Sequence, residues 1–306
     1  MEQPPVKQDA FASESTRAAM LAVLLLLAAI CCFDIMSLLV RILSARYAAP
    51  ELSAYRNVLG IVPSVALLLW TGELRLRGTS LRIENWPLAV ARGIAVAFAQ
   101  LFFYTALGKL ELATVATLGQ TNALFVVLLS VILLGERVGP WRVGALLAGF
   151  AGVVWILRPG SDAFSSAGFY PIAAAFCYAL SMVTVRMFGP GTSNGLLYLY
   201  SSASAAVGAV ILAAFTTEFT PLQSLADAAL IFTMGVLGGV GVLMMMLAYR
   251  SAAPSLLAPF GYFGILSAFF WGWMVFGEAP VDTLFPGVLL IVGAGVLIMW
   301  RENRRG

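Results

Sequence analysis

Runs of apolar residues about twenty long, separated by short polar breaks, follow one another from residue 18 to residue 300. A bilayer core about 30 Å thick requires about 20 apolar residues in each helix that crosses it. The runs have about this length and contain few charged residues. They predict ten membrane-spanning helices, at residues 18–40, 52–71, 87–107, 112–134, 141–157, 168–187, 195–216, 226–249, 254–276 and 283–300.

Composition agrees with the membrane class. Hydrophobic residues make up 61% of the chain, charged residues 11%, and the mean hydropathy is +0.93. Soluble domains average about 45–50% apolar and about 25% charged residues. The net charge of +3 is small and its basic residues are scattered, so we expect no nucleic-acid partner. Residues 1–17 are expected to form a disordered cytoplasmic tail and residues 301–306 a basic cytoplasmic tail.

The chain contains two similar halves, residues 18–160 and 161–300. The most similar stretches are LLGERVGPWRVGALLAGFAGVVWILRPG (133–160) and VFGEAPVDTLFPGVLLIVGAGVLIMWREN (275–303), in which the Gly-Glu pairs and several glycines coincide. Each half has five predicted spans. Because five is odd, the second half enters the membrane from the opposite side. Inverted repeats around a central cavity are typical of secondary transporters, although a repeat can also serve only as a packing scaffold.

Basic residues set the expected orientation. With the N-terminus inside, twelve Lys and Arg residues lie in inner loops and tails, and four, Arg41, Arg46, Lys109 and Arg158, lie outside. The positive-inside rule therefore predicts both termini in the cytoplasm.

The segments LLGE and FGE, which close the fourth and ninth spans, and GFAGVVWILRPG resemble the EamA family of the drug/metabolite transporter superfamily. The stretch ARGIAVAFAQLFFYTALGKLELA (91–113) further resembles the branch that contains carriers of S-adenosylmethionine, amino acids and other amphiphilic metabolites. The resemblance implies transport more firmly than it implies a cargo. The chain departs from many relatives at Ala123, where they have a proline in the middle of the fourth span.

Asp34 is the one acidic residue well inside a predicted span. A charge at the bilayer centre costs about 2.5–3.5 kcal/mol on insertion scales, so it is retained for a reason. Arg56 enters the second span from the same side of the membrane. Two interpretations follow: a structural Asp34–Arg56 ion pair, or a carboxylate that binds a cationic substrate group or a proton.

The other polar residues within the spans are candidates for the cavity. Arg92, Gln100 and Tyr104 share one face of the third span because they are eight and four residues apart. Gln100 and Tyr104 are expected to bind substrate, and Arg92 to reach the cytoplasmic interface or take part in gating. Gln120 and Tyr262 occupy corresponding positions in the two halves and are expected to face each other across the cavity as substrate contacts.

Glu136 and Glu278 end corresponding spans on opposite sides of the membrane. Each is expected either to mark the interface or to form a gating contact with an arginine of a neighbouring span.

The leading hypothesis is a secondary transporter in the bacterial inner membrane that moves a small amine-bearing, zwitterionic or amphiphilic metabolite by alternating access, with protons as a candidate coupling ion. The alternatives are an exporter of drugs and organic cations and, in another class, a non-transporting scaffold. The chain has no histidine, metal-binding motif or nucleotide-binding motif, so we expect no enzyme activity, metal or cofactor. Its expected partners are the substrate and the lipid bilayer, with the chain acting as a monomer or homodimer.

Overall fold

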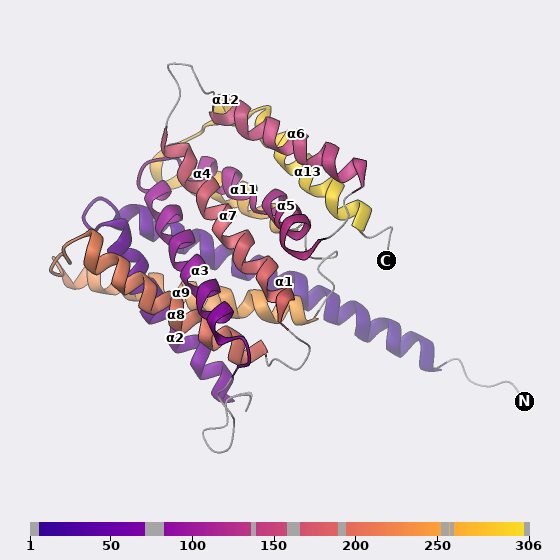
Figure 1. Ribbon diagram of the computed structural model, residues 1–306, viewed down its shortest axis with the longest axis horizontal. Helices are drawn as coiled ribbons and strands as arrows, with labels where there is room; N and C mark the ends of the chain where they lie inside the picture. The colour runs from indigo at the N-terminus through magenta and orange to yellow at the C-terminus, as the bar shows by residue number, and fades with distance from the viewer. Residues whose placement is uncertain are drawn as a thin grey trace, which may run out of the picture.

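The computed structural model describes residues 6–70, 83–135, 139–157, 166–188, 194–251, 257 and 260–302, and every regular element among them is helical (Figure 1). The α-helices of the first half are α1 (Val6–Leu43), α2 (Ala49–Trp70), α3 (Trp86–Leu107), α4 (Leu112–Gly119), α5 (Asn122–Leu134) and α6 (Pro140–Leu157). Those of the second half are α7 (Phe169–Thr184), α8 (Asn194–Thr216), α9 (Leu225–Ser251), α11 (Phe263–Phe276), α12 (Val281–Leu284) and α13 (Gly287–Glu302). Two short 3₁₀ helices, η1 (Ser166–Gly168) and η2 (Val185–Met187), flank α7.

Six helical stretches of the described chain are long and apolar enough to cross a membrane. They are Ala19–Leu43, Trp86–Leu107, Leu112–Leu134, Ser166–Met187, Leu197–Thr216 and Leu225–Met245, and three shorter apolar helices cover Val143–Leu157, Phe263–Phe276 and Gly287–Leu297. The predicted all-α membrane class is therefore confirmed. The number of ten spans stays a prediction.

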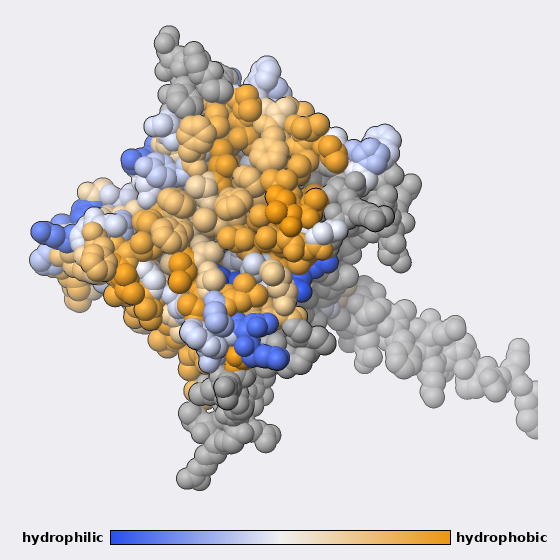
Figure 2. Space-filling view, in the orientation of Figure 1, coloured by the Kyte–Doolittle hydropathy of each residue, from blue (hydrophilic) through white to orange (hydrophobic). Residues whose placement is uncertain are grey.

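The surface of the bundle is apolar. Hydrophobic side chains cover most of the face seen in Figure 2, and hydrophilic ones gather mainly at its margins. Ile132, Leu147 and Leu266 are 65%, 66% and 69% exposed. A water-soluble monomer rarely exposes so much contiguous apolar surface, whereas lipid chains solvate it.

The N-terminal helix is longer than predicted. The backbone of α1 is helical from Val6, so residues 6–17 continue the first span instead of forming a disordered tail. Its first part projects beyond the bundle (Figure 1). This stretch contains no glycine or proline, so nothing in it stops a helix that has already nucleated from extending.

The predicted span 112–134 is interrupted. Helix α4 ends at Gly119, α5 begins at Asn122, and the amides of Gln120 and Thr121 bond to carbonyls three residues back. The Thr121 hydroxyl also donates to the Leu118 carbonyl at 2.6 Å. A glycine followed by a hydroxyl that bonds to nearby backbone weakens a helix even without a proline. In the second half, α11 begins at the corresponding place, directly after Tyr262.

Helix contacts follow a symmetrical scheme. Helix α1 packs on α9 and α11, α2 packs on α8 and α9, α3 packs on α7 and α8, and α5 packs on α7. If the halves are exchanged as the sequence repeat predicts, α1–α9 becomes α7–α3, α2–α9 becomes α8–α3, and α1–α11 becomes α7–α5. The pairs α2–α8 and α6–α13, which also pack together, map onto themselves. Helix α4 packs on α7 and α11 of the other half.

Glycines allow the closest of these contacts, as expected for helices packed in lipid. In α6, a Cβ on Gly152 would lie 2.6 Å from the Gly287 carbonyl oxygen, while a Cβ on Gly144 would meet no atom of the described residues within 4 Å. The α6–α13 pair, which lies side by side in Figure 1, is therefore tight at one end and open at the other.

This contact predicts the effect of adding one methyl group. In Gly152→Ala, the Cβ meets the Gly287 oxygen and, at 2.9 Å, the Leu290 Cβ, so α6 and α13 must separate. Overpacking typically costs about 1–3 kcal/mol, and we expect a lower melting temperature in detergent. Gly144→Ala on the same helix is the control and should leave the melting temperature unchanged or slightly higher. Equal losses in both variants would contradict the described packing.

Candidate functional site

A group of four polar residues lies inside the helix bundle, and we call it the central polar cluster: Arg56, Asn57, Gln100 and Tyr104. The Asn57 amide donates to the Gln100 side-chain oxygen and, at 2.8 Å, to the Ser53 carbonyl. Asn57, Gln100 and Tyr104 are 4%, 4% and 1% exposed. The cluster joins α2 to α3. The structure therefore places two of the predicted cavity residues, Gln100 and Tyr104, in buried positions next to α2.

Arg56 is the charged member of this cluster. Its guanidinium donates to the Gly238 carbonyl of α9 at 3.3 Å and to the Asn57 side-chain oxygen at 3.5 Å. The Nε atom is buried and has no hydrogen-bond partner in the described part of the chain. The phenols of Tyr104 and Tyr178 lie within electrostatic reach of the guanidinium.

The sequence analysis missed Tyr178. It stands next to the residue that corresponds to Asp34, since CFDIMSLLVR (32–41) lies over CYALSMVTVR (177–186). This correspondence was the available signal for a polar residue in the second half.

Asp34 does not form the ion pair that the sequence suggested. Among the described residues the ion pairs are Arg41–Glu278 and Arg46–Asp227, and neither Asp34 nor Arg56 takes part. Asp34 instead lies close to Ser267 of α11, and its Oδ2 atom is buried without a hydrogen-bond partner. The physical reason is that Arg56 extends toward α9 while the carboxylate lies beside α11.

Gln120 and Tyr262 lie at the two helix breaks. The Gln120 amide donates to the Gly261 carbonyl at 3.4 Å, so the breaks of the two halves touch. Tyr262 extends away from this contact, because its hydroxyl occupies the space where Gly295 of α13 lacks a Cβ. Its ring packs against the apolar cluster of Ile265 and Ile291. The two residues are therefore close through the backbone, while their side chains take different directions.

Arg92 connects three helices. Its Nε donates to the Ser181 carbonyl of α7 at 2.9 Å, and its Nη1 donates to the Ser201 hydroxyl of α8 at 2.7 Å. A residue that only extends to the membrane surface would not make these two directed bonds.

Glu278 forms an ion pair with Arg41. The two guanidinium Nη atoms donate to the two carboxylate oxygens, one at 2.6 Å, and the guanidinium also lies 4.5 Å from the centre of the Phe276 ring. Gly277 precedes the carboxylate with φ of +67°, a left-handed helix end that favours glycine. The pair joins the end of α1 to the end of α11. Glu136 lies outside the described residues, but Gly135 before it ends α5 with the same φ of +67°.

A second buried network, which the sequence analysis missed, lies where α1, α2 and α9 meet. Asp227 forms an ion pair with Arg46 at 2.7 Å and accepts a hydrogen bond from the Tyr47 hydroxyl at 3.0 Å. Glu51 accepts from the Tyr55 hydroxyl and from the Thr220 amide, each at 3.0 Å. Both carboxylates are 0% exposed. Each stands in the first turn of its helix, where acids commonly occur, so the sequence offered no reason to separate them from ordinary helix starts.

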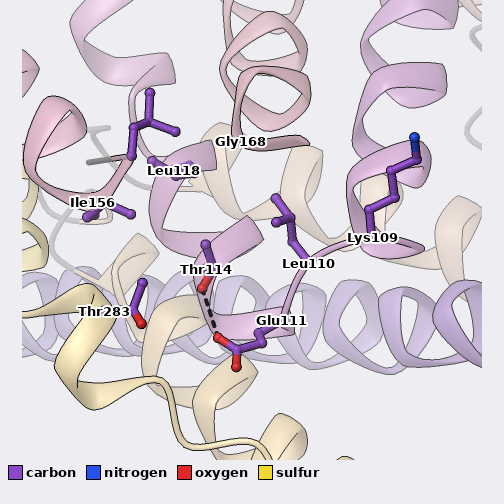
Figure 3. Close-up of a pocket in the computed structure, with 9 residues that line it drawn as sticks. Lys109, Leu110, Glu111, Thr114, Leu118, Ile156, Gly168 and Thr283 are labelled. Carbon is purple, nitrogen blue, oxygen red and sulfur yellow. Dashed lines mark hydrogen bonds between the residues drawn. The ribbon is translucent and has the colours of Figure 1, made fainter. Parts of the chain in front are cut away.

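A cavity of about 300 Å³ opens between the start of α4, the end of α6 and the start of α7 (Figure 3). Its polar lining residues are Lys109, Glu111, Thr114 and Thr283. The Thr114 hydroxyl donates to Glu111 at 3.4 Å, and Lys109 lies 5.2 Å from the Tyr170 ring. None of the predicted substrate residues lines this cavity, so it is separate from the central polar cluster. The described residues also contain no group of three or more potential metal ligands.

The bonds of Arg92 predict how it responds to substitution. Lysine reaches a membrane surface as well as arginine does, but one ammonium cannot reproduce two directed bonds to different helices. We therefore expect Arg92→Lys to lower the melting temperature nearly as much as Arg92→Gln. A lysine variant as stable as the wild type would support the interfacial role instead.

Comparison with known proteins gives the chain its relatives. Residues 20–158 match the model of the EamA-like transporter family. The riboflavin transporter of Rhizobium johnstonii is 29% identical over 98% of this chain and 97% of its own length. The pseudopaline exporter of Pseudomonas aeruginosa is 27% identical over 85% of this chain and 89% of its own length. The S-adenosylmethionine uptake transporter of Rickettsia bellii is 22% identical over 89% of each.

A solved crystal structure has the same fold, with a TM-score of 0.63 and 23% identity over 92% of this chain and 97% of that one. The matched family and the named relatives are transporters rather than enzymes. Residues 20–158 of the chain are thus similar to the EamA-like transporter family.

Proposed function

We propose that the chain is a secondary transporter that moves a small amine-bearing or zwitterionic metabolite across the inner membrane by alternating access. The observation that carries the proposal is the carboxylate of Asp34 on α1, whose buried Oδ2 has no hydrogen-bond partner among the described residues. A structural acid in a membrane helix would be expected to have its oxygens satisfied by the protein. An unsatisfied oxygen suits a group that binds a cation or a proton for part of a cycle.

The scheme of helix contacts supports two inverted halves. The pairs α1–α9, α2–α9 and α1–α11 each have a counterpart when the halves are exchanged, and the pairs α2–α8 and α6–α13 map onto themselves. The α6–α13 pair departs from this symmetry, because it is close at Gly152 and open at Gly144. In a transporter built from inverted repeats, the opposite conformation is obtained by exchanging the roles of the halves. We infer that the tight and open ends of this pair exchange during transport.

The remaining predicted residues have distinct proposed roles. Gln100 and Tyr104 would contact the substrate from α3 when the bundle opens. Gln120 would do so from the break between α4 and α5, since interrupted helices commonly form the substrate site of transporters built from inverted repeats. Tyr262 lies against α13 and would contact substrate only after a movement of α11.

The relatives do not decide the cargo or its direction. Their names include an exporter and uptake transporters, and they name chemically different molecules. An exporter of organic cations is the alternative, because an acid that binds an amine also binds other cations. A transporter of zwitterionic metabolites requires an anionic group on its cargo, whereas an exporter of organic cations does not.

Counterflow in proteoliposomes tests the proposal. Purified wild type should exchange at least one compound from a panel of amino acids, S-adenosylmethionine, riboflavin, nucleosides and organic cations. Asp34→Asn keeps the size of the side chain but removes its charge, so exchange of a cationic or zwitterionic compound should fall by about tenfold or more.

The fold of the variant is the control for this test. Asp34→Asn should retain a wild-type elution profile and a melting temperature close to that of the wild type, because no ion pair is lost. Full exchange by Asp34→Asn would exclude Asp34 from the binding of cargo. No exchange of any compound by folded wild type would contradict the transporter assignment.

The Arg41–Glu278 pair is our proposed gate at the outer end of the bundle, with sides assigned from the expected orientation. It ties α1 of one half to α11 of the other, and these helices must separate for the end to open. The repeat places Glu136 and Arg186 at the corresponding positions of the inner end, and we extend the role to them. Arg92, which links α3 to the second half, would hold the halves together away from the gates.

A charge exchange tests the gate. Glu278→Arg places two guanidiniums against each other, so the counterflow rate and the melting temperature should both fall. Arg41→Glu combined with Glu278→Arg restores an ion pair of opposite direction and should recover a substantial part of both. A double variant no better than either single variant would show that the contact is not the relevant interaction.

A further inference from the structure

Arg56 lies about two turns into α2, which begins at Ala49, and it extends toward α9. The guanidinium fits against α9 because the facing residue, Gly238, has no side chain. A Cβ on Gly238 would lie 2.7 Å from the Arg56 Nε and 3.0 Å from the Met36 sulfur. Any larger residue at position 238 would displace the guanidinium from the cluster.

The charge of Arg56 is not balanced by an acid of the described chain. Neither ion pair among the described residues includes it. Its two acceptors are a carbonyl at 3.3 Å and an amide oxygen at 3.5 Å, and its Nε has none. A guanidinium has five N–H donors in a planar fork that matches a carboxylate, so most of its bonding capacity is unused.

Arg92 provides an internal comparison. It also lies within a predicted span, and it too has no carboxylate partner among the described residues. Its bonds at 2.7 and 2.9 Å have ordinary geometry and join three helices. The structure therefore distinguishes an arginine that holds helices together from one whose donors are left for another group.

The surroundings of Arg56 supply further donors. Within the described chain, the Tyr104 hydroxyl forms a hydrogen bond to the Met36 sulfur alone, at 3.6 Å, and a thioether is a weak acceptor. The phenol of Tyr178 on α7 lies within electrostatic reach of the guanidinium. An anionic oxygen placed beside Arg56 would replace the weak sulfur contact and gain the unused N–H groups.

We propose that Arg56, assisted by Tyr104 and Tyr178, binds a carboxylate of the transported molecule. The inference rests on the proposed function and deepens it, since it requires the cargo to carry an anionic group in addition to the cationic group assigned to Asp34. The favoured cargo is then an α-amino acid or a derivative that retains its amine and carboxylate. A neutral flavin and a simple organic cation both lack the anionic group that Arg56 would bind.

Matched pairs of probes that differ only in the carboxylate test this inference. The pairs are S-adenosylmethionine with decarboxylated S-adenosylmethionine, and tryptophan with tryptamine, each measured by counterflow into proteoliposomes. Wild type should exchange the acid of at least one pair about tenfold or more faster than its decarboxylated partner, as expected for the loss of a charge-assisted bidentate contact. In Arg56→Gln this preference should disappear, and Arg56→Lys should retain part of it because the charge remains.

The ratio of the two rates separates binding from folding. A purely structural Arg56 would give a variant with lower activity toward both probes and an unchanged ratio, which would overturn the inference. Equal exchange of acid and amine by wild type would overturn it as well. Exchange restricted to riboflavin or organic cations would overturn it while leaving transport established, and no exchange at all by folded wild type would instead contradict the proposed function.

Discussion

The absence of water from the bilayer core is the constraint on which this structure depends. A polar group inside the bundle must find its partner within the protein, and most of those described do so. Asn57 bonds to Gln100 and Arg92 bonds to two neighbouring helices. Four of the described residues, Asp34, Glu51, Arg56 and Asp227, nevertheless keep a buried polar atom without a hydrogen-bond partner. Of these, Asp34 and Arg56 lie more than one turn inside their predicted spans, and neither belongs to a described ion pair. Retaining two opposite charges unpaired is costly, and a ligand that carries both charges would satisfy them together.

The same constraint explains how the halves meet. Lipid offers helices no hydrophobic reason to associate, so they pack through close backbone contact. Gly152 provides such contact between α6 and α13, and Gly238 makes room for the Arg56 guanidinium on α9. Glycine therefore has two uses in this chain: it brings helices together, and it leaves space for a polar side chain. A symmetrical scheme of contacts with one unsymmetrical helix pair is the arrangement expected of a repeat protein held in one of two conformations.

The sequence predicted the class, the family and the buried acid, because composition and motifs do not depend on how helices rotate about their axes. The sequence-based predictions were wrong where the direction of a side chain depends on how its helix is rotated about its axis. Arg56 and Asp34 were expected to pair, yet their side chains extend toward different helices. The break after Gly119 was missed because the search relied on proline, while here a glycine and the Thr121 hydroxyl interrupt the helix. Tyr178 was missed because a tyrosine among apolar residues has no periodicity that marks it as a cavity residue.

Alternating access requires the two ends of the bundle to open in turn, and this movement is visible only in a comparison of conformations. A pair of spin labels at Ala45 and Ala279 would report the distance across the α1–α11 end. In a second variant, labels at Leu133 and Met187 would report the distance across the α5–α7 end. All four positions are exposed. With the native cysteines replaced, double electron–electron resonance in lipid nanodiscs would measure both distances without and with a compound that exchanges. The account predicts that one distance lengthens as the other shortens. Distances that stay fixed, or that change in the same direction, would contradict it.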